Sequence, residues 1–188
     1  MTTAARTRTR TRTPLLLVLG GARSGKSAYA EGRVSDRCGA DVLYVATLLP
    51  GDGGEDGRIA AHRRRRPGSW TTASVDTHGN IVTAVCEHAR RSGLLLDGFE
   101  LAVALARPQS DAAARTFATR SASACRATTA DLVCVVGSEV GLGVHPETEA
   151  GIVFRDRAGA ANQALAAIAD EVVLMVAGLP LWLKGGPR

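Results

Sequence analysis

The chain has 188 residues, of which 45% are hydrophobic and 22% are charged, proportions typical of a globular protein with one buried core. No apolar run approaches the length of a membrane-spanning helix, so we expect no membrane span. Of the net charge of +5, four charges come from an RTRTRTRT repeat near the start, which leaves +1 for the rest and argues against nucleic acid as a partner.

The composition also separates a tail from a single domain. Residues 1–13 are predicted to be a disordered Arg/Thr tail, because a like-charged polar run has nothing apolar to bury. Residues 14–188 contain no linker that would divide them, which predicts one domain. The four cysteines form no CxxC pair and have no histidine at a metal-ligand spacing. We therefore expect a reduced, cytoplasmic protein without a structural metal site.

Short apolar runs alternate along the chain with longer stretches that are compatible with helices. The apolar runs lie at 15–19, 41–48, 94–97, 131–137 and 171–178. The helix-compatible stretches lie at 28–38, 77–91, 111–129 and 150–168. Apolar runs without polar alternation are typical of strands that are buried on both faces, as in parallel sheets. The pattern predicts an α/β fold, a doubly wound, mostly parallel sheet with helices on both faces.

The segment between the first predicted strand and the first predicted helix fits the phosphate-binding pattern GxxxxGK[ST]. Its residues are Gly20, Gly21, Ala22, Arg23, Ser24, Gly25, Lys26 and Ser27. Glycines let successive backbone N–H groups turn toward phosphate oxygens, and the helix that follows adds the positive end of its dipole. Lys26 can then reach the β- and γ-phosphates, and Ser27 can ligate Mg²⁺. The segment predicts a P-loop NTPase-like fold and a nucleoside triphosphate substrate.

An acidic residue, Asp97, ends the third apolar run. This is the position at which P-loop proteins hold Mg²⁺ with a carboxylate, either directly or through water. An aspartate at the end of a strand is also typical of a turn or a helix cap, so this residue depends on the P-loop for its interpretation.

The segment RIAAHRRRRPGSW, residues 58–70, places one histidine before four arginines. On a helix, Arg58, His62 and Arg66 would share one face, and Pro67 predicts that the helix ends at Arg66. Nearby cations lower the pKa of an imidazole, which favours its neutral, nucleophilic form. The arginines would hold a triphosphate and offset the charge of a leaving pyrophosphate. A solvated helix end is the alternative interpretation.

Five segments together resemble the adenosylcobinamide kinase/adenosylcobinamide-phosphate guanylyltransferase family of cobalamin biosynthesis. They are GGARSGKS, LYVAT, RIAAHRRRRPGSW, SEVGLGVHPE and FRDRAGAANQALAAIADEVVLMVAGLPLWLK, in order between about Leu15 and Lys184. The resemblance implies an enzyme that phosphorylates adenosylcobinamide with a nucleoside triphosphate, ATP or GTP. It also implies transfer of GMP from GTP to that phosphate through a guanylyl-histidine. The family's assembly implies a homo-oligomer, a trimer with its sites between subunits.

The same resemblance assigns roles to individual positions. His62 becomes the guanylylated nucleophile and Lys26 the catalytic lysine of the P-loop. Nucleotide binding is assigned to residues 20–27 and 97 and to Ala46, Thr47, Leu48, Arg63, Arg64, Arg65 and Arg66. The metal ligands for Mg²⁺ are Ser27 and Asp97.

The sequence also departs from the family pattern. Ser74 stands where the family usually carries an acidic residue that could read the guanine base, and Ser138 stands where an asparagine is usual. The family's D-E-M segment is replaced by GEDG at 54–57, and the aromatic–Asn pattern after Asp97 is missing. One alternative is a plain P-loop small-molecule kinase in which His62 has no role. Another is a non-catalytic protein, or a divergent paralogue, that retains only nucleotide or nucleic-acid binding.

Overall fold

The computed structural model describes residues 12–47, 64, 66–75, 78 and 80–186. The strands are β1 (Leu15–Gly20), β2 (Val42–Ala46), β3 (Thr71–Ser74), β4 (Gly93–Asp97), β5 (Leu132–Ser138), β6 (Glu171–Val176) and β7 (Leu179–Lys184). The helices are α1 (Lys26–Cys38), α3 (Ile81–Cys86), α4 (Phe99–Ala106), α5 (Asp111–Arg126) and α6 (Glu149–Ile168).

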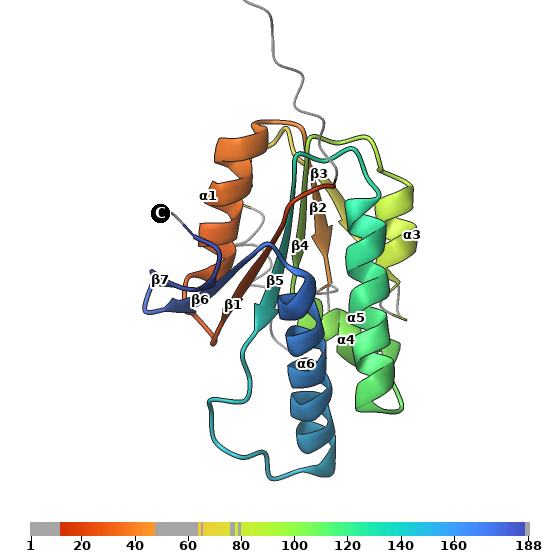
Figure 1. Cartoon of the computed structure of the whole chain (residues 1–188), viewed down its shortest axis with the longest axis vertical. Helices are drawn as coiled ribbons and strands as arrows, with labels where there is room; N and C mark the ends of the chain where they lie inside the picture. Colours follow the sequence, from red (N-terminus) through yellow and green to blue (C-terminus); the bar gives the residue numbers. More distant parts are fainter. Residues whose placement is uncertain (1–11, 48–63, 65, 76–77, 79, 187–188) are drawn as a thin grey trace, which may run out of the picture.

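The described strands form one sheet in the order β3-β2-β4-β5-β1-β6-β7. Neighbouring strands pair in parallel except for β6 and β7, which pair in an antiparallel hairpin. Helix α1 covers one face of the sheet, and α3, α4, α5 and α6 cover the other (Figure 1). The predicted α/β class and doubly wound, mostly parallel architecture are therefore confirmed.

Strand β1 shows why an unbroken apolar run was the correct signal for a central strand. All six of its residues are buried. Leu15, Leu17 and Leu19 pack in the core beneath α3–α6, whereas Leu16 and Val18 pack in the core beneath α1. Each buried aliphatic side chain contributes about 1.5–3 kcal/mol relative to exposure. Because both faces of β1 are packed, the strand gives firm support to the loop that follows its carboxyl end.

Three elements escaped the sequence analysis, and one helix is shorter than predicted. Strands β3 and β7 lie at the two edges of the sheet and are only partly buried, so their sequences lack a fully apolar run. Helix α4, FELAVALA, has almost no polar face because it packs against the sheet and against α5 and α6. In the described part of the helix predicted over 77–91, the structure has α3 at Ile81–Cys86.

Two cysteines behave as small hydrophobic residues. Cys125 and Cys134 are completely buried in the cores on opposite faces of the sheet. Burial raises the pKa of the Cys125 thiol to about 12 and raises that of Cys134 as well. These thiols are therefore protonated at neutral pH and contribute packing rather than reactivity.

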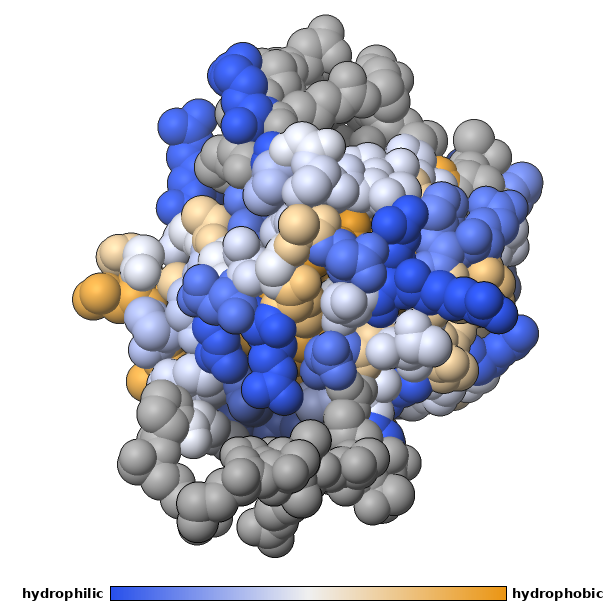
Figure 2. Space-filling view, turned by 90° about the horizontal axis from the view of Figure 1, so that it is seen from above, coloured by the Kyte–Doolittle hydropathy of each residue, from blue (hydrophilic) through white to orange (hydrophobic). Residues whose placement is uncertain are grey.

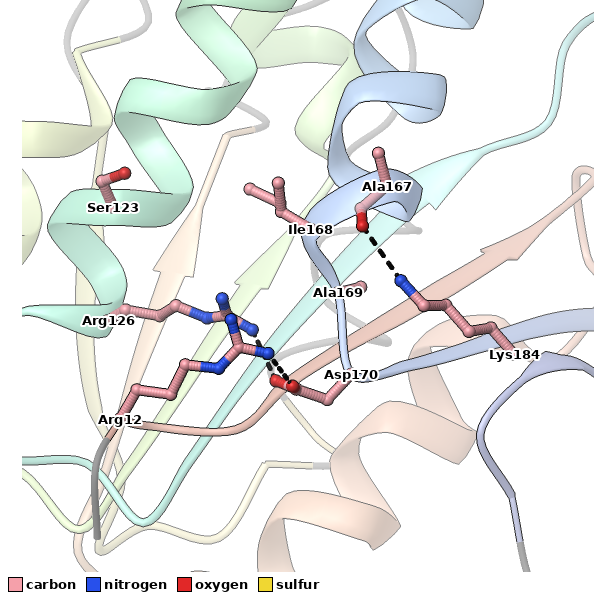
Figure 3. A pocket seen from close by; sticks show the side chains of 8 residues that line it. All are labelled: Arg12, Ser123, Arg126, Ala167, Ile168, Ala169, Asp170 and Lys184. Atoms are coloured by element: carbon pink, nitrogen blue, oxygen red, sulfur yellow. Dashed lines mark hydrogen bonds and ion pairs between the residues drawn. The ribbon is translucent and has the colours of Figure 1, made fainter.

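The end of the predicted Arg/Thr tail contacts the folded domain, which moves the boundary of the tail. Figure 3 shows Arg12 and Arg126 pointing at the carboxylate of Asp170, and both form ion pairs with it. Asp170 also accepts a hydrogen bond from the backbone N–H of Leu15 at 2.8 Å. Thr13 is buried and donates to the carbonyl of Ala130 at 3.2 Å. Arg12 and Thr13 therefore belong to the domain and lie beside the amino-terminal end of the central strand β1.

Asp170 predicts a pH-dependent contribution to stability. Partial burial tends to raise its pKa, but the Leu15 N–H and the two arginines outweigh this and lower it. A folded-state pKa below the unfolded value contributes stability above about pH 4, which is lost as the pH falls further. Asp170→Asn should therefore lower the free energy of unfolding by about 1–2 kcal/mol at pH 7. Urea unfolding of both proteins at pH 7 and pH 3 measures this difference, and an equal difference at both pH values would contradict the assignment.

Candidate active site

The GxxxxGK[ST] segment forms a tight loop between the end of β1 and the start of α1. Gly25 precedes the helix with φ of 89°, a left-handed conformation that glycine adopts readily. A Cβ at Gly20 would collide with the Ser24 hydroxyl and the backbone of Met175. The turn between β6 and β7 also supports the loop, because the Gly178 N–H donates to the Ser24 carbonyl at 3.0 Å. Glycine is therefore required at these loop positions for steric and conformational reasons.

Two buried polar groups in this loop retain hydrogen-bonding capacity that no side chain or backbone group of the described residues is seen to use. The Lys26 side chain is buried, and its ammonium donates to the Gly21 carbonyl at 3.2 Å, which uses one of its three hydrogens. The Ser24 hydroxyl is buried and has no hydrogen-bond partner among the described residues. Buried donors that remain unpaired cost free energy unless a ligand satisfies them. An anion in the loop, such as a triphosphate, is the complementary ligand.

The structure brings Ser27 and Asp97 together from positions 70 residues apart. The Ser27 hydroxyl donates to Oδ1 of Asp97 at 3.2 Å. Both groups are hard oxygen donors beside the phosphate loop, and Mg²⁺ takes such ligands together with phosphate oxygens and water. This donor set fits the predicted magnesium site. Among the described residues no cluster of three His, Cys, Asp or Glu side chains could hold a metal by itself.

Tyr44, which the sequence analysis did not single out, connects Asp97 to the arginine segment. Its hydroxyl donates to Oδ2 of Asp97, the carboxylate oxygen that does not face Ser27. The guanidinium of Arg66 lies 3.4 Å from the centre of the Tyr44 ring, in a cation–π contact. Burial and the neighbouring Asp97 carboxylate raise the pKa of Tyr44, so its hydroxyl remains a donor at neutral pH. The last of the four arginines thus lies at the P-loop site.

Two more of the predicted nucleotide-binding residues, Ala46 and Thr47, lie at the carboxyl end of β2 beside Asp97. Ala46 ends β2 and pairs with Asp97. Thr47 is buried, and its hydroxyl contacts the carbonyls of Asp97 and Gly98 at 2.9 and 2.7 Å. Thr47 therefore supports the turn that carries Asp97. Ser74, where the family usually has an acid, is exposed at the end of β3 beside Ala46.

Several predicted residues lie outside the described part of the chain. These are His62, Leu48, Arg63 and Arg65, together with the GEDG segment at 54–57. Arg64 is described and exposed. The nucleophilic role of His62 and the phosphate-binding role of its neighbours remain predictions.

A second group that sequence reasoning missed lies at the carboxyl end of β5. Glu100 is 8% exposed and accepts two hydrogen bonds from Ser138, from its hydroxyl at 2.6 Å and its backbone N–H at 2.9 Å. Asn162, from α6, donates to the Ser138 carbonyl at 3.1 Å. An isolated glutamate within the apolar helix FELAVALA was the available signal, because a buried acid requires a partner.

Comparison with known proteins identifies the family that combines these motifs. The profile of the CobU family, described as cobinamide kinase / cobinamide phosphate guanyltransferase, matches residues 16–183. The chain belongs to this family. The bifunctional adenosylcobalamin biosynthesis protein CobP of Pseudomonas aeruginosa is 37% identical over 173 residues, covering 91% of this chain and 98% of that protein. The corresponding CobU protein of Salmonella typhimurium is also 37% identical, over 90% of this chain and 99% of that protein.

The CobU family assignment confirms the sequence-based identification of a cobinamide kinase and cobinamide phosphate guanylyltransferase of adenosylcobalamin biosynthesis. Among solved structures, an ATPase from a bacterial type III secretion system has a TM-score of 0.57 at 8% identity, over 86% of this chain and 50% of that chain. At this identity the likeness concerns the fold alone, and it confirms the P-loop NTPase-like architecture. No helix among the described residues is long and apolar enough to cross a membrane.

The Tyr44 contact predicts a role for this residue in orienting Asp97. Tyr44→Phe keeps the ring beneath Arg66 but removes the hydroxyl that holds one carboxylate oxygen. Residues that orient a metal ligand typically affect activity by about 10–100-fold when they are changed. We expect kinase turnover to fall by about tenfold and the Mg²⁺ concentration needed for half-maximal activity to rise. Kinase titrations with Mg²⁺ test this, and an unchanged requirement would show that the Tyr44 hydroxyl serves packing alone.

Proposed function

We propose that this chain performs both family reactions at the nucleotide site formed by the P-loop, Asp97 and the arginine segment. In the first, the loop binds a nucleoside triphosphate and the γ-phosphoryl group passes to the hydroxyl of adenosylcobinamide. In the second, His62 takes GMP from GTP and passes it to adenosylcobinamide phosphate. The observation that carries the proposal is the contact series from Ser27 through Asp97 and Tyr44 to Arg66, because it joins the P-loop to the segment that contains His62.

The residues of the P-loop would carry out the kinase step mainly by positioning and charge. The Lys26 ammonium and the loop N–H groups would bind the β- and γ-phosphates, and the Ser24 hydroxyl would gain the partner that it lacks among the described residues. Ser27 and Asp97 would hold Mg²⁺, which supplies charge neutralisation between the phosphates when bound. The acceptor oxygen forms a bond to the γ-phosphorus while the bond to the nucleoside diphosphate breaks.

The guanylyltransferase step would need an enzyme nucleophile. A neutral imidazole nitrogen of His62 attacks the α-phosphorus of GTP, a P–N bond forms, and pyrophosphate leaves. An oxygen of adenosylcobinamide phosphate then attacks the same phosphorus and breaks the P–N bond, which yields adenosylcobinamide-GDP. Arg63, Arg64, Arg65 and Arg66 would offset the charge of the pyrophosphate. The kinase step requires no such nucleophile, so the two reactions should be separable by mutation.

The finer features of the family extend to this chain as proposals. We infer a homo-oligomer, a trimer, which works in the cytoplasm. Strand β7 is consistent with a subunit contact, because Leu179, Leu181 and Leu183 are 71%, 54% and 57% exposed along one edge of the sheet. In Figure 2, apolar surface projects on the left, the side on which the β6–β7 hairpin lies. Proteins bury apolar surface of this kind against a partner.

Two substitutions test the division of labour between the P-loop and the histidine. His62→Asn, which is similar in size but a poor nucleophile, should keep kinase turnover within about threefold while removing the guanylyl-enzyme. Lys26→Ala should lower kinase turnover by at least about 10³-fold, because Lys26 acts on charge that develops during transfer. Incubation with α-labelled GTP, followed by denaturing electrophoresis, detects the adduct, which should be released by acid and survive alkali.

The same two variants distinguish the alternatives. Normal labelling of His62→Asn would place the nucleophile elsewhere. A wild-type protein that phosphorylates adenosylcobinamide but never becomes labelled would be a plain P-loop kinase. Near wild-type kinase turnover of Lys26→Ala would contradict the P-loop assignment itself.

Ser74 predicts weak selection for guanine. A carboxylate at this position could accept hydrogen bonds from the N1 and N2 donors of guanine, which a serine hydroxyl cannot match. We expect ATP to compete with GTP in labelling the wild-type enzyme, and Ser74→Glu to increase the preference for GTP by about tenfold. Thr72→Glu, on the same exposed side of β3, is the matched control for added charge. An equal gain in both variants would attribute the effect to charge rather than to base recognition.

A further inference from the structure

Glu100, which is buried, and Ser138, which is partly buried, form a hydrogen-bonded pair that the reactions described above do not use. Ser138 ends β5, and β5 lies between β1, which carries the P-loop, and β4, which carries Asp97. Gly20, the first residue of the loop, pairs directly with Ser138 in the sheet. Asp97 pairs with Val136, two residues before Ser138, so Ser138 ends a strand whose neighbours carry the phosphate loop and the proposed magnesium ligand.

The alternation of β5 places the Cβ of Ser138 on the face of the sheet that α1 covers. Cys134 and Val136 belong to the core beneath α1, the face that also holds Tyr44. Ser138 follows Val136 at a spacing of two residues and so projects on that same face. Ser27, Tyr44 and Asp97 meet on this side. The Ser138 side chain thus leaves the sheet on the same side as the groups proposed to bind the triphosphate and Mg²⁺, and its hydroxyl turns toward Glu100 in the first turn of α4.

Glu100 determines the direction in which the Ser138 hydroxyl can bond. Its two carboxylate oxygens accept the Ser138 hydroxyl and the Ser138 N–H, and Asn162 holds the carbonyl of the same residue. Because the hydroxyl proton points at Glu100, only lone pairs remain available toward the site. Such an oxygen cannot donate to a phosphate, which is itself an acceptor. It can accept a hydrogen bond from the O–H group of an alcohol.

We propose that Ser138 contacts the attacking hydroxyl of the corrinoid acceptor during phosphoryl transfer and that Glu100 receives the proton through it. The acceptor oxygen bonds to the γ-phosphorus, and the nucleoside diphosphate leaves with the electron pair of the broken bond. The acceptor proton passes to Ser138 Oγ as the Ser138 proton passes to the Glu100 carboxylate, which then returns it to solvent. Ser138 is thus a catalytic residue and Glu100 a positioning residue that acts through it.

This inference rests on the kinase half of the proposed function and leaves the guanylyl half unaffected. Formation of a guanylyl-histidine from GTP involves no acceptor alcohol, so the Ser138–Glu100 pair has no proton to receive in that step. A change at either residue should therefore lower kinase turnover and leave formation of the guanylyl-enzyme intact, which is the opposite of the effect expected for His62→Asn. A purely structural role would instead lower thermal stability and both reactions together.

Three variants and one control test the proposal. Ser138→Ala removes the accepting oxygen and should lower kcat for phosphorylation of adenosylcobinamide by about 10²-fold, within the range for proton transfer by a positioned group. Ser138→Thr keeps the hydroxyl and should retain most of the turnover. Glu100→Gln should behave like Ser138→Ala, because an amide donor facing the serine forces its proton outward. Ser123→Ala, an exposed serine near the far end of α5, is the matched control.

The measurements are kcat and KM for both substrates, the yield of labelled guanylyl-enzyme, and the melting temperature. The proposal expects kcat for phosphorylation to fall. The KM for the nucleotide and the yield of guanylyl-enzyme should stay within about twofold of wild type, and the melting temperature should stay within a few degrees. A proton path through one pair also expects Glu100→Gln/Ser138→Ala to lose little more than either single variant.

The opposing outcomes are distinct. Unchanged kcat in folded Ser138→Ala would overturn the proposal, as would equal losses of kinase turnover and guanylyl-enzyme, which would assign the pair to nucleotide or metal binding. A large fall in melting temperature for both Ser138 variants would assign it to folding. Absence of phosphoryl transfer in the wild-type enzyme would instead contradict the proposed function.

Discussion

The position of the Asp97 carboxylate is the constraint on which the candidate active site depends. One oxygen accepts a hydrogen bond from Ser27 at the start of α1, and the other accepts one from Tyr44 in β2. Thr47 holds the backbone carbonyl of Asp97. Because these contacts come from different segments, the carboxylate has little freedom to rotate. If Asp97 binds Mg²⁺ as proposed, a carboxylate held in this way would receive the ion and the phosphates without reorganising first.

The fixed carboxylate also supports the proposed role of the arginine segment at the P-loop site. Arg66 stacks on Tyr44, whose hydroxyl bonds to Asp97, so one side chain separates a cation of the segment from the proposed magnesium ligand. In a site built from such contacts, a single bound triphosphate could meet the lysine and hydroxyls of the loop at one end and the arginines at the other. Two group transfers at different phosphorus atoms would then share one nucleotide position.

Hydrogen-bond direction distinguishes the groups at this edge of the sheet. Lys26 and the Ser24 hydroxyl can donate toward the loop and are suited to anions. Ser138 differs, because its hydroxyl donates a hydrogen bond to Glu100 and retains only lone pairs for another group. Donors and an acceptor on neighbouring segments match the proposed reaction between a phosphate and an alcohol. Burial of a carboxylate without hydrogen-bond partners costs free energy, and both oxygens of Glu100 accept hydrogen bonds from Ser138.

The sequence by itself determined the parts of this protein that depend on local patterns. The apolar run at 15–19 predicted a strand buried on both faces, and GxxxxGK[ST] predicted the phosphate loop, because local backbone geometry dictates both. Ordered motifs over most of the chain identified the family. Contacts between distant segments were decided only by the tertiary structure. In the sequence alone, Tyr44 is one of several apolar residues of a predicted strand, and Glu100 is a single acidic residue in an apolar segment. Their roles become visible only when the sheet order places β2, β4 and β5 side by side. A hydrogen bond such as that between Glu100 and Ser138 spans 38 residues, and its partner depends on which strands become neighbours.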